Sequence, residues 1–403
     1  MPDNIDQFSA VDSALGYLYQ VRCALLWSLR RLKIEPVFDA SIETLDDITF
    51  ESNGTAQELL QTKHHKNRVA NLTNASADLW KTLRIWIAAW DADHISSTTI
   101  LYLVTTENVV SGTTAGYLKS NGRDIDNALQ LLVKTARTST STTNAPAYAA
   151  FLAKSSEEQR SLIERIFVVD SAPDIGDLDQ LLKSEIFHAC SREHQNAFME
   201  YLEGWWFRRA IEQLEKVDTG ARISSQDLED KMADLRNRFR RDSLPIADDL
   251  LNYQLEDETA VSHGDFPFVQ QIKLASSHAT RVASAIQDYY RAFEQRSRWQ
   301  RQDLLFIGDL RTYEMRLIEE WKLLFAAIED RLGDEPTEED KKAAAKEILF
   351  WVETGDVKAR IKQDVTEAFI TRGSLHILSN ELRVGWHPDF RSRLLHLMER
   401  VSA

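Results

Sequence analysis

Acidic, amide and basic side chains occur at short spacing in the first hundred residues. Glu43 and Asp47 are the acids, and the motif Gln61-Thr62-Lys63 follows them. An acid, a carboxamide and an ammonium group are costly to bury together unless they interact. Carboxylate and carboxamide oxygens are suitable ligands for Mg²⁺, and a lysine can stabilise developing negative charge. These residue types would suit metal-dependent hydrolysis of a phosphodiester.

Each residue of this set has an expected role in such a site. Asp47 would bind the divalent ion, and Gln61 or its water and the carbonyl of Thr62 would complete one side. Lys63 would orient the attacking water or stabilise charge on the phosphorane. Glu43 would bind metal or act as a base. The ion, Mg²⁺ or Mn²⁺, would polarise the phosphate and lower the pKa of its bound water.

Two predicted strands bring these side chains together. The run SIETLDDITFE (residues 41–51) alternates with period two, which predicts one strand with both acids on one face. The run ELLQTKHH (residues 58–65) predicts the next strand. An Asn-Gly pair between the runs is typical of a hairpin turn. The hairpin would place Asp47 beside Gln61 and Lys63.

Helices and further strands surround this hairpin in the sequence. GYLYQVRCALLWSLRRL (residues 16–32) and ADLWKTLRIWIAAWD (residues 77–91) have the apolar spacing of helices. TTILYLVTTENV (residues 98–109) is a continuous apolar run, typical of a strand buried on both faces. IFVVD (residues 166–170) predicts a short strand, either in this sheet or in a separate small one. The order helix, strand, hairpin, strand, helix, strand predicts a small α/β module.

The chain is long enough for two or three domains, and its second part has mainly helical patterns. The polar run TSTSTTNAPA (residues 138–147) predicts a loop or hinge. Long helical patterns dominate from about residue 177. We therefore expect an α/β domain at residues 8–145 and a predominantly helical interaction or oligomerisation domain at residues 146–403.

Composition limits the possible classes of protein. Lys and Arg number 48 against 63 Asp and Glu, a formal charge of −15. This balance disfavours nonspecific coating of nucleic acid, although a local basic groove or a carboxylate site that needs metal remains compatible with it. Two cysteines cannot build a disulfide framework, and no apolar run is long enough to span a membrane. We expect a cytoplasmic protein.

The acid followed by a QxK motif, with this order of elements, resembles the PD-(D/E)xK nuclease superfamily. More narrowly, GYLYQ, SIETLDDI, LLQTKHH and DLWKTLRIW look like the double-stranded-DNA endonuclease domain of bacterial antiviral effectors, including those associated with cyclic-oligonucleotide signalling. The resemblance implies a restriction-endonuclease-like core that cleaves double-stranded DNA with Mg²⁺ or Mn²⁺. It also implies that Tyr19 and Gln20 lie near the active site. His64 is a further candidate, for phosphate contact or for a structural role at the strand end.

The rest of the chain resembles the helical C-terminal region of ABC-three component system proteins. The resemblance lies in RIFVVDSAPDIGDLD, FMEYLEGWWFRR, DSLPIADDLL, IQDYYRAFEQRSRWQRQDLL and RGSLHILSNELRVGWHPDF. It implies a defence effector encoded with a middle component and an SMC-like ABC ATPase. A homo-oligomer is also expected. Because an unrestrained nuclease would endanger host DNA, partner subunits are expected to gate it.

Several alternatives stay open at this level. Asp46 competes with Asp47 as the acid, and we prefer Asp47 because an apolar residue follows it. Gln61 replaces the usual Glu, so a DNA-binding or scaffold subunit without catalysis is the alternative function. A basic cluster in LRNRFRRD is a candidate for DNA contact, although helix–helix salt bridging is the alternative. The cluster consists of Arg236, Arg238, Arg240 and Arg241.

Overall fold

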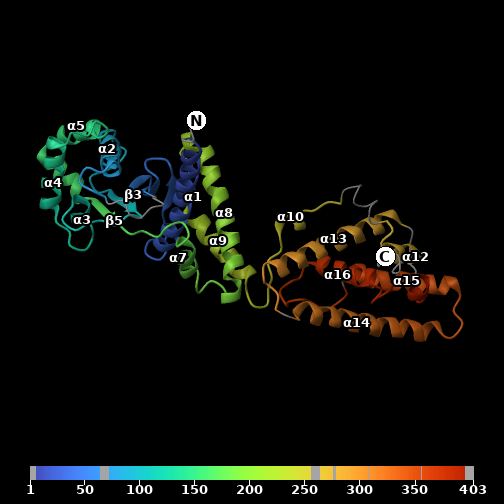
Figure 1. Cartoon of the computed structure of the whole chain (residues 1–403). Coiled ribbons are helices and arrows are strands. Elements are labelled where there is room, and N and C mark those ends of the chain that lie inside the picture. The colour runs from blue at the N-terminus through green and yellow to red at the C-terminus, as the bar shows by residue number, and fades with distance from the viewer. Residues whose placement is uncertain are drawn as a thin grey trace, which may run out of the picture. The chain divides into compact units, whose positions relative to one another are not determined.

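The computed structural model describes residues 6–63, 72–255, 264–275, 278–306, 308–354 and 356–394. The chain divides into two compact units (Figure 1). Unit 1 comprises Met1–Ala189 and Phe198–Leu235, and unit 2 comprises Cys190–Ala197 and Arg236–Ala403. The domain boundary that the sequence predicts after residue 145 lies inside unit 1.

Unit 1 is built on one mixed sheet of six strands, in the order β5-β4-β3-β2-β1-β6. Strand β1 pairs antiparallel with β6 and with β2, and β2 pairs antiparallel with β3. Strands β3, β4 and β5 run parallel to one another. The strands are β1 (Asp39–Ile42), β2 (Ile48–Ser52), β3 (Thr55–Lys63), β4 (Ile100–Thr105), β5 (Ile166–Val169) and β6 (Ile223–Ser224). The IFVVD run therefore joins this sheet, whereas β6 was not predicted.

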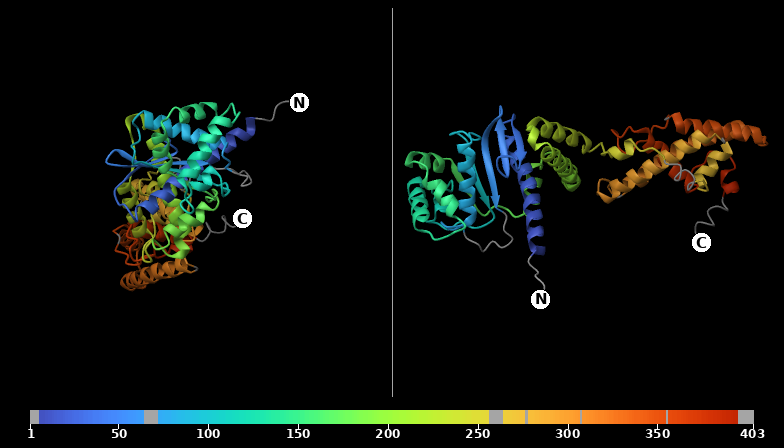
Figure 2. Two further views of the ribbon diagram at one scale, coloured as in Figure 1. Left: turned by 90° about the vertical axis from the view of Figure 1, so that its left-hand side faces the viewer. Right: turned by 90° about the horizontal axis from the view of Figure 1, so that it is seen from above.

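Helices cover both faces of the sheet. Figure 2 shows α2 to α6 on one side of the strands and α1 on the other. The helices are α1 (Asp6–Arg31), α2 (Ala77–Asp91), α3 (Thr114–Tyr117), α4 (Ile125–Thr138), α5 (Ala145–Leu152), α6 (Ser156–Glu164), α7 (Leu178–Glu185), α8 (Gln195–Glu215) and α9 (Ser225–Arg238), with short 3₁₀ turns at Arg192–His194 and Val217–Thr219. The indole of Trp206 on α8 donates a hydrogen bond of 2.9 Å to the carbonyl of Val21 on α1, which joins these two helices.

The apolar face of α2 forms the centre of the core in unit 1. Trp80 and Trp86 of this helix are fully buried. Trp80 packs edge-on against Tyr148 and Phe151 of α5, with ring centroids 4.5 and 5.8 Å apart. A fully buried aromatic side chain removes a large apolar area from water, so these contacts hold α2 firmly against α5.

The single strand predicted for residues 41–51 is wrong, because a tight loop divides it into β1 and β2. Ile42 pairs with Ile48, and residues 43–47 connect the two strands. Glu43 has a φ of 54°, in the left-handed region, so the chain reverses there instead of continuing as a strand. The alternation of polar and apolar residues runs on through this turn, which concealed it. We call residues 43–47 the acid loop.

Unit 2 is mainly helical in its described residues, as the sequence predicts. Its helices are α10 (Asp248–Leu251), α12 (Pro267–Ala275), α13 (Ala279–Arg301), α14 (Asp309–Leu332), α15 (Glu338–Thr354) and α16 (Ala368–Asn380). Helix α16 packs closely against α13 at Gly373. A Cβ atom at this position would lie 2.0 Å from the carbonyl oxygen of Asp288, so only glycine allows this approach.

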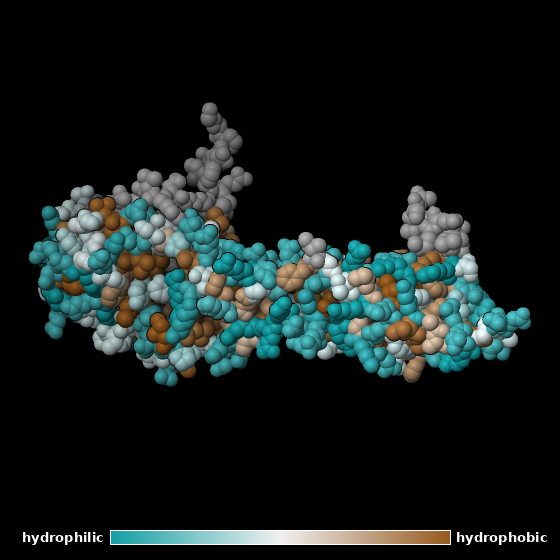
Figure 3. All heavy atoms as spheres, turned by 90° about the horizontal axis from the view of Figure 1, so that it is seen from below, coloured by the Kyte–Doolittle hydropathy of each residue, from teal (hydrophilic) through white to brown (hydrophobic). Residues whose placement is uncertain are grey.

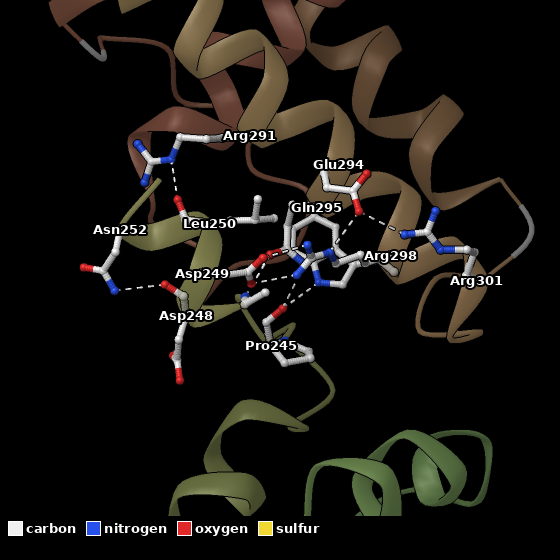
Figure 4. A network of polar contacts seen from close by, with 12 residues as sticks. Pro245, Asp248, Asp249, Leu250, Asn252, Arg291, Glu294, Gln295, Arg298 and Arg301 are labelled. Atoms are coloured by element: carbon white, nitrogen blue, oxygen red, sulfur yellow. Dashed lines mark hydrogen bonds and ion pairs between the residues drawn. The ribbon is translucent and has the colours of Figure 1, made fainter. Parts of the chain in front are cut away.

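The segment that leads into α10 lies along α13 and is held by side chains of that helix (Figure 4). The Trp299 indole donates to the Pro245 carbonyl at 2.7 Å, and the Gln295 side chain accepts from the Ala247 N–H at 2.9 Å. Arg291 donates to a carbonyl within α10, that of Leu250, at 2.6 Å. These bonds satisfy backbone groups that no helix or sheet satisfies, so the segment is an integral part of unit 2.

Among the described residues, no helix is both long and apolar enough to cross a bilayer. Figure 3 shows a mainly hydrophilic face on which the hydrophobic residues form separate patches.

Candidate functional site

The carboxylate of Asp47 is anchored on the end of β3. Its Oδ2 accepts hydrogen bonds from the backbone N–H of Thr62 at 2.7 Å and from the Thr62 hydroxyl at 2.8 Å. The pairing of β2 with β3 begins at Ile48 and Leu60, so the Asp47 side chain takes the place of a strand partner beyond that point. The sequence predicted Asp47 beside Gln61 and Lys63, whereas its hydrogen bonds are to Thr62, the residue between them. The contact fixes Asp47 beside the QxK motif, while its Oδ1 accepts no hydrogen bond from the described residues.

Glu43 lies across the acid loop from Asp47. The N–H of Glu43 donates to the carbonyl of Asp47 at 3.1 Å, so the two acids flank the loop instead of sharing a strand face as predicted. The pKa of Glu43 is raised by partial burial and by the negative charge of Asp47. A hydrogen bond from Gln20 and the nearby charges of Lys63 and Lys81 act in the opposite direction. Glu43 is therefore part of one electrostatic cluster with Asp47 and Lys63.

Asp46, the competing acid, points into the protein. Its Oδ2 accepts a hydrogen bond from the fully buried Trp86 indole at 2.5 Å, and its Oδ1 accepts from the Asp47 N–H at 3.0 Å. Burial, with the Asp47 charge next, raises the Asp46 pKa to about 7. Because both oxygens are engaged, Asp46 is unsuited to bind a ligand, and the preference for Asp47 agrees with this geometry.

Gln61 and Lys63 lie at the same end of β3. Gln61 is only 3% exposed, and its Oε1 has no hydrogen-bond partner within the part of the chain that the structure describes. An unsatisfied buried carbonyl oxygen is costly, so a cation or water at this position would stabilise it. Lys63 is half-buried. Its positive charge is near Glu43 and Asp46 and partly offsets the rise that burial causes in both of their pKa values.

The near-site candidates on α1 have different surroundings. Gln20 lies close enough to Glu43 to lower the pKa of that carboxyl, so it is near the acid loop. The Tyr19 side chain is buried, and its hydroxyl donates to the carbonyl of Pro173 at 3.0 Å, beyond the end of β5. Burial is also the main cause of the raised pKa of Tyr19. His64 lies outside the described residues.

Three side chains around the acid loop and the end of β3 carry oxygen atoms of the kinds that hard divalent cations bind. Asp47 has Oδ1, and Gln61 has an Oε1 without a partner among the described residues. The carboxylate of Glu43 is close enough to Asp47 for the Asp47 charge to raise its pKa. Mg²⁺ and Mn²⁺ prefer oxygen ligands of these kinds. A bound cation would also relieve the repulsion between the two acids.

Sequence reasoning did not identify two residues that hold the acid loop. Trp86 was seen only as part of a Trp-rich helix, and Gln213 on α8 had no evident role. The Oε1 of buried Gln213 accepts from the N–H of Ile42 at 3.1 Å, and its Nε2 donates to the Thr44 hydroxyl at 3.3 Å. Gln213 is separated from Ile42 by 171 positions, so no local pattern could reveal the contact.

The candidate DNA contacts lie around the end of α9, where unit 1 gives way to unit 2. Arg236, Arg240 and Arg241 are exposed, and Arg238 is half-buried with a guanidinium nitrogen 3.8 Å from Asp248. Their role in DNA contact stays a prediction.

Arginines of the aromatic-rich helix α13 form ion pairs with acids of unit 2. Arg298 binds both oxygens of Asp249, at 2.7 and 2.8 Å, and also Glu294 at 3.0 Å. Arg301 binds Glu294 at 3.1 Å (Figure 4). Both arginines are therefore engaged in ion pairs within unit 2.

A second group of potential metal ligands occurs in unit 2, at Glu338, His387 and Asp389. The Nδ1 of His387 accepts from the Asp389 N–H at 3.0 Å, so the ring proton lies on Nε2, the nitrogen that is 3.7 Å from Glu338. That nitrogen is then a donor and not a metal ligand. The two carboxylates are also paired with Arg393 and Lys341. This group does not fit a cation.

The helical region matches a known family. Residues 268–394 match the model of C-terminal domain 7 of the ABC-three component (ABC-3C) systems. The matched residues include α13, α14, α15 and α16. The match supports membership of the chain in an ABC-3C system, which is consistent with a role in defence. No curated protein and no solved structure matches the chain.

Proposed function

We propose that unit 1 is a metal-dependent endonuclease that hydrolyses double-stranded DNA, and that the chain is an antiviral effector of its ABC-3C system. One observation carries the proposal. The Asp47 carboxylate is fixed to β3 beside the QxK motif, with Glu43 across the loop and an unpartnered Gln61 oxygen at the same strand end.

The order of elements is a second support. Helix α1 precedes three antiparallel strands, and α2 then leads to β4, which is parallel to β3. This order agrees with the core that the resemblance to PD-(D/E)xK nucleases implies. The acid lies before the second strand of the meander, and the QxK motif ends the third.

The residues around the acid loop would have different roles in phosphodiester hydrolysis. Asp47, Gln61 and Glu43 would hold the cation, which when bound supplies a polarised phosphate and a more acidic water. Lys63 places a positive charge where negative charge develops on the phosphate oxygens. As an alternative to binding the cation, Glu43 could act as the base, because its raised pKa favours uptake of the proton of the attacking water.

Partner subunits would control this activity. The ABC-3C match implies other components of the system, and the resemblance points to an ABC ATPase and a middle component. We expect weak cleavage by the lone chain and strong cleavage in the assembled system. Strong constitutive cleavage by the lone chain would contradict the gating.

The substitution Lys63→Ala tests the nuclease directly. Plasmid cleavage is measured with Mg²⁺ or Mn²⁺, with the chain alone and with the components encoded beside it. We expect a loss of about 100-fold or more, because a charge that stabilises the transition state is removed. Lys134→Ala is the matched control, since Lys134 is exposed on α4. Retained cleavage in Lys63→Ala would overturn the assignment.

A second candidate function is a DNA-binding or scaffold subunit without catalysis. The uncharged Gln61 favours it, because an amide attracts a divalent cation less strongly than a carboxylate does. Under this alternative the chain would bind DNA or the ATPase, cleavage would be absent in every assembly, and Lys63→Ala would leave defence intact.

A further inference from the structure

The acid loop has an unfavourable backbone conformation and needs external support. Glu43 has a φ of 54°, which residues other than glycine rarely adopt. Such a conformation persists only where surrounding contacts impose it. Contacts from two helices outside the hairpin meet the loop. One comes from Trp86 on α2 and the other from Gln213 on α8.

We propose that Trp86 and Gln213 are positioning residues that hold the acid loop where Glu43 and Asp47 can bind a cation together. This inference rests on the proposed function, because it assigns these residues to the same site. Neither residue is proposed to touch the cation or the DNA.

The Trp86 contact acts through Asp46. The indole donates to one oxygen of Asp46 at 2.5 Å, and the other oxygen accepts the N–H of Asp47 at 3.0 Å. Both Trp86 and Asp46 are buried. A buried site strengthens hydrogen bonds. The chain of bonds therefore fixes the backbone of Asp47 relative to α2.

The Gln213 contact acts on the other end of the loop. Strand β6 pairs only with Asp39 and Ala40 of β1, so Ile42 lies beyond its reach. Gln213 accepts the N–H of Ile42 and donates to the hydroxyl of Thr44, which donates in turn to the Ile42 carbonyl at 3.4 Å. Because Gln213 is 2% exposed, water cannot easily replace it. The start of the acid loop is therefore fixed relative to α8.

The two contacts predict how metal affinity responds to their loss. Residues behind the direct ligands of a metal typically change its affinity by about 10-fold to 100-fold when they are replaced. Removing either contact would free one end of the loop, and the distance between the carboxylates of Glu43 and Asp47 would vary. The anchoring of Asp47 on Thr62 would remain, so the cation would be bound more weakly and not lost.

The test uses Trp86→Phe and Gln213→Leu in the full chain. Trp86→Phe keeps a large ring and removes the donor, and Trp90→Phe on the same helix is its control. Gln159→Leu is the control for Gln213→Leu, because Gln159 is also buried but donates to the carbonyls of Phe151 and Lys154.

Two measurements are made on each variant. In the metal-free protein, amide hydrogen exchange at residues 42–47 should be faster by about 10-fold or more in both test variants and unchanged in both controls. The dissociation constant for Mn²⁺, measured by calorimetry, should rise by about 10-fold to 100-fold in the test variants alone. Gln213→Glu keeps the acceptor for Ile42 and should lie between Gln213→Leu and the unaltered chain; it also serves if Gln213→Leu fails to fold.

The outcomes separate the inference from the proposed function. The inference would be overturned if amide exchange in Trp86→Phe and in Gln213→Glu equals that of the unaltered chain. It would also be overturned if exchange is faster but the Mn²⁺ dissociation constant is unchanged. Mn²⁺ binding is also compared between the unaltered chain and Asp47→Asn. If the unaltered chain binds no Mn²⁺, or if Asp47→Asn binds it equally well, the proposed function is overturned instead. In that case the exchange rates alone would still decide whether these residues hold the loop.

Discussion

Two neighbouring carboxylates in unit 1 have opposite surroundings. Asp46 is directed into the core, and both of its oxygens accept hydrogen bonds. Asp47 uses one oxygen to bind Thr62 and keeps the other available. Adjacent residues of a loop can point in different directions, so sequence position alone could not assign these roles. The different hydrogen bonds of the two carboxylates distinguish Asp46 from Asp47.

Gln61→Glu should destabilise the metal-free protein and strengthen its binding of Mn²⁺. A second buried carboxylate near Asp47 and Glu43 should lower the free energy of unfolding without metal by about 2 kcal/mol. The added charge should in turn lower the Mn²⁺ dissociation constant by about 10-fold or more. Thermal melts with and without Mn²⁺ measure both effects.

The control for this substitution is Gln57→Glu. Gln57 is half-buried near the start of the same strand, away from the acid loop. It should change neither the melting temperature without metal nor the shift that Mn²⁺ causes. An equal Mn²⁺ shift in both variants would place the cation elsewhere.

His376 in unit 2 should make stability depend on pH. Burial is the main cause that lowers its pKa from 6.5 to about 4. The unfolded chain therefore binds a proton at this residue below about pH 6.5, whereas the folded chain does so only near pH 4. The contribution of neutral His376 to the free energy of unfolding is fully present above pH 6.5. It falls by about 3 kcal/mol as the pH drops to 4.

His376→Gln should remove this part of the pH dependence. Urea unfolding between pH 7 and pH 4.5 measures it, and the variant should lose less stability over this range than the unaltered chain does. His188→Gln, at an exposed position, should behave like the unaltered chain. Equal slopes for His376→Gln and the unaltered chain would contradict the prediction.

At the level of elements, the contact of α13 with α16 depends on one glycine. In Gly373→Ala, the new Cβ would lie 2.0 Å from the Asp288 carbonyl and 2.5 Å from the Cβ of Ala292, so the helices must separate. Forcing atoms into a packed core costs about 1–3 kcal/mol or more. We expect a lower melting temperature by calorimetry.

Gly204→Ala provides the comparison for this substitution. Gly204 is also in a helix, α8, and a Cβ there would meet no atom within 4 Å. Alanine favours helix by about 1 kcal/mol over glycine, so this variant should be as stable as the unaltered chain or more stable. A loss of stability in Gly204→Ala equal to that in Gly373→Ala would refute the packing argument.

The sequence predicted elements well where one periodicity ran undisturbed. The helix at residues 77–91 agrees with α2, and the apolar run at residues 98–109 contains β4. The acid loop was missed because its polar residues continue the alternation of the strands on either side. The site residues could be named from their types, whereas the roles of Trp86 and Gln213 depend on contacts between distant segments.

At the level of the whole molecule, unit 1 extends well beyond the predicted boundary. A chain of residues 1–145 would lack β5, β6, most of α5 and the whole of α8, and Trp80 would lose its contact with Phe151. A chain of residues 1–235 retains the sheet and all of these helices. We expect a cooperative thermal transition, seen by near-ultraviolet circular dichroism, for residues 1–235 only. A cooperative transition for residues 1–145 would show that the shorter segment is sufficient.

The long separation between Ile42 and Gln213 affects the order of events during synthesis. A ribosome releases the hairpin with its acids well before it has made the last turn of α8, which is 171 positions later. Until then one end of the acid loop has no glutamine to hold it. The nascent chain would therefore carry Glu43 and Asp47 before Gln213 can fix the start of the acid loop. That contact forms only when more than half of the chain has been translated.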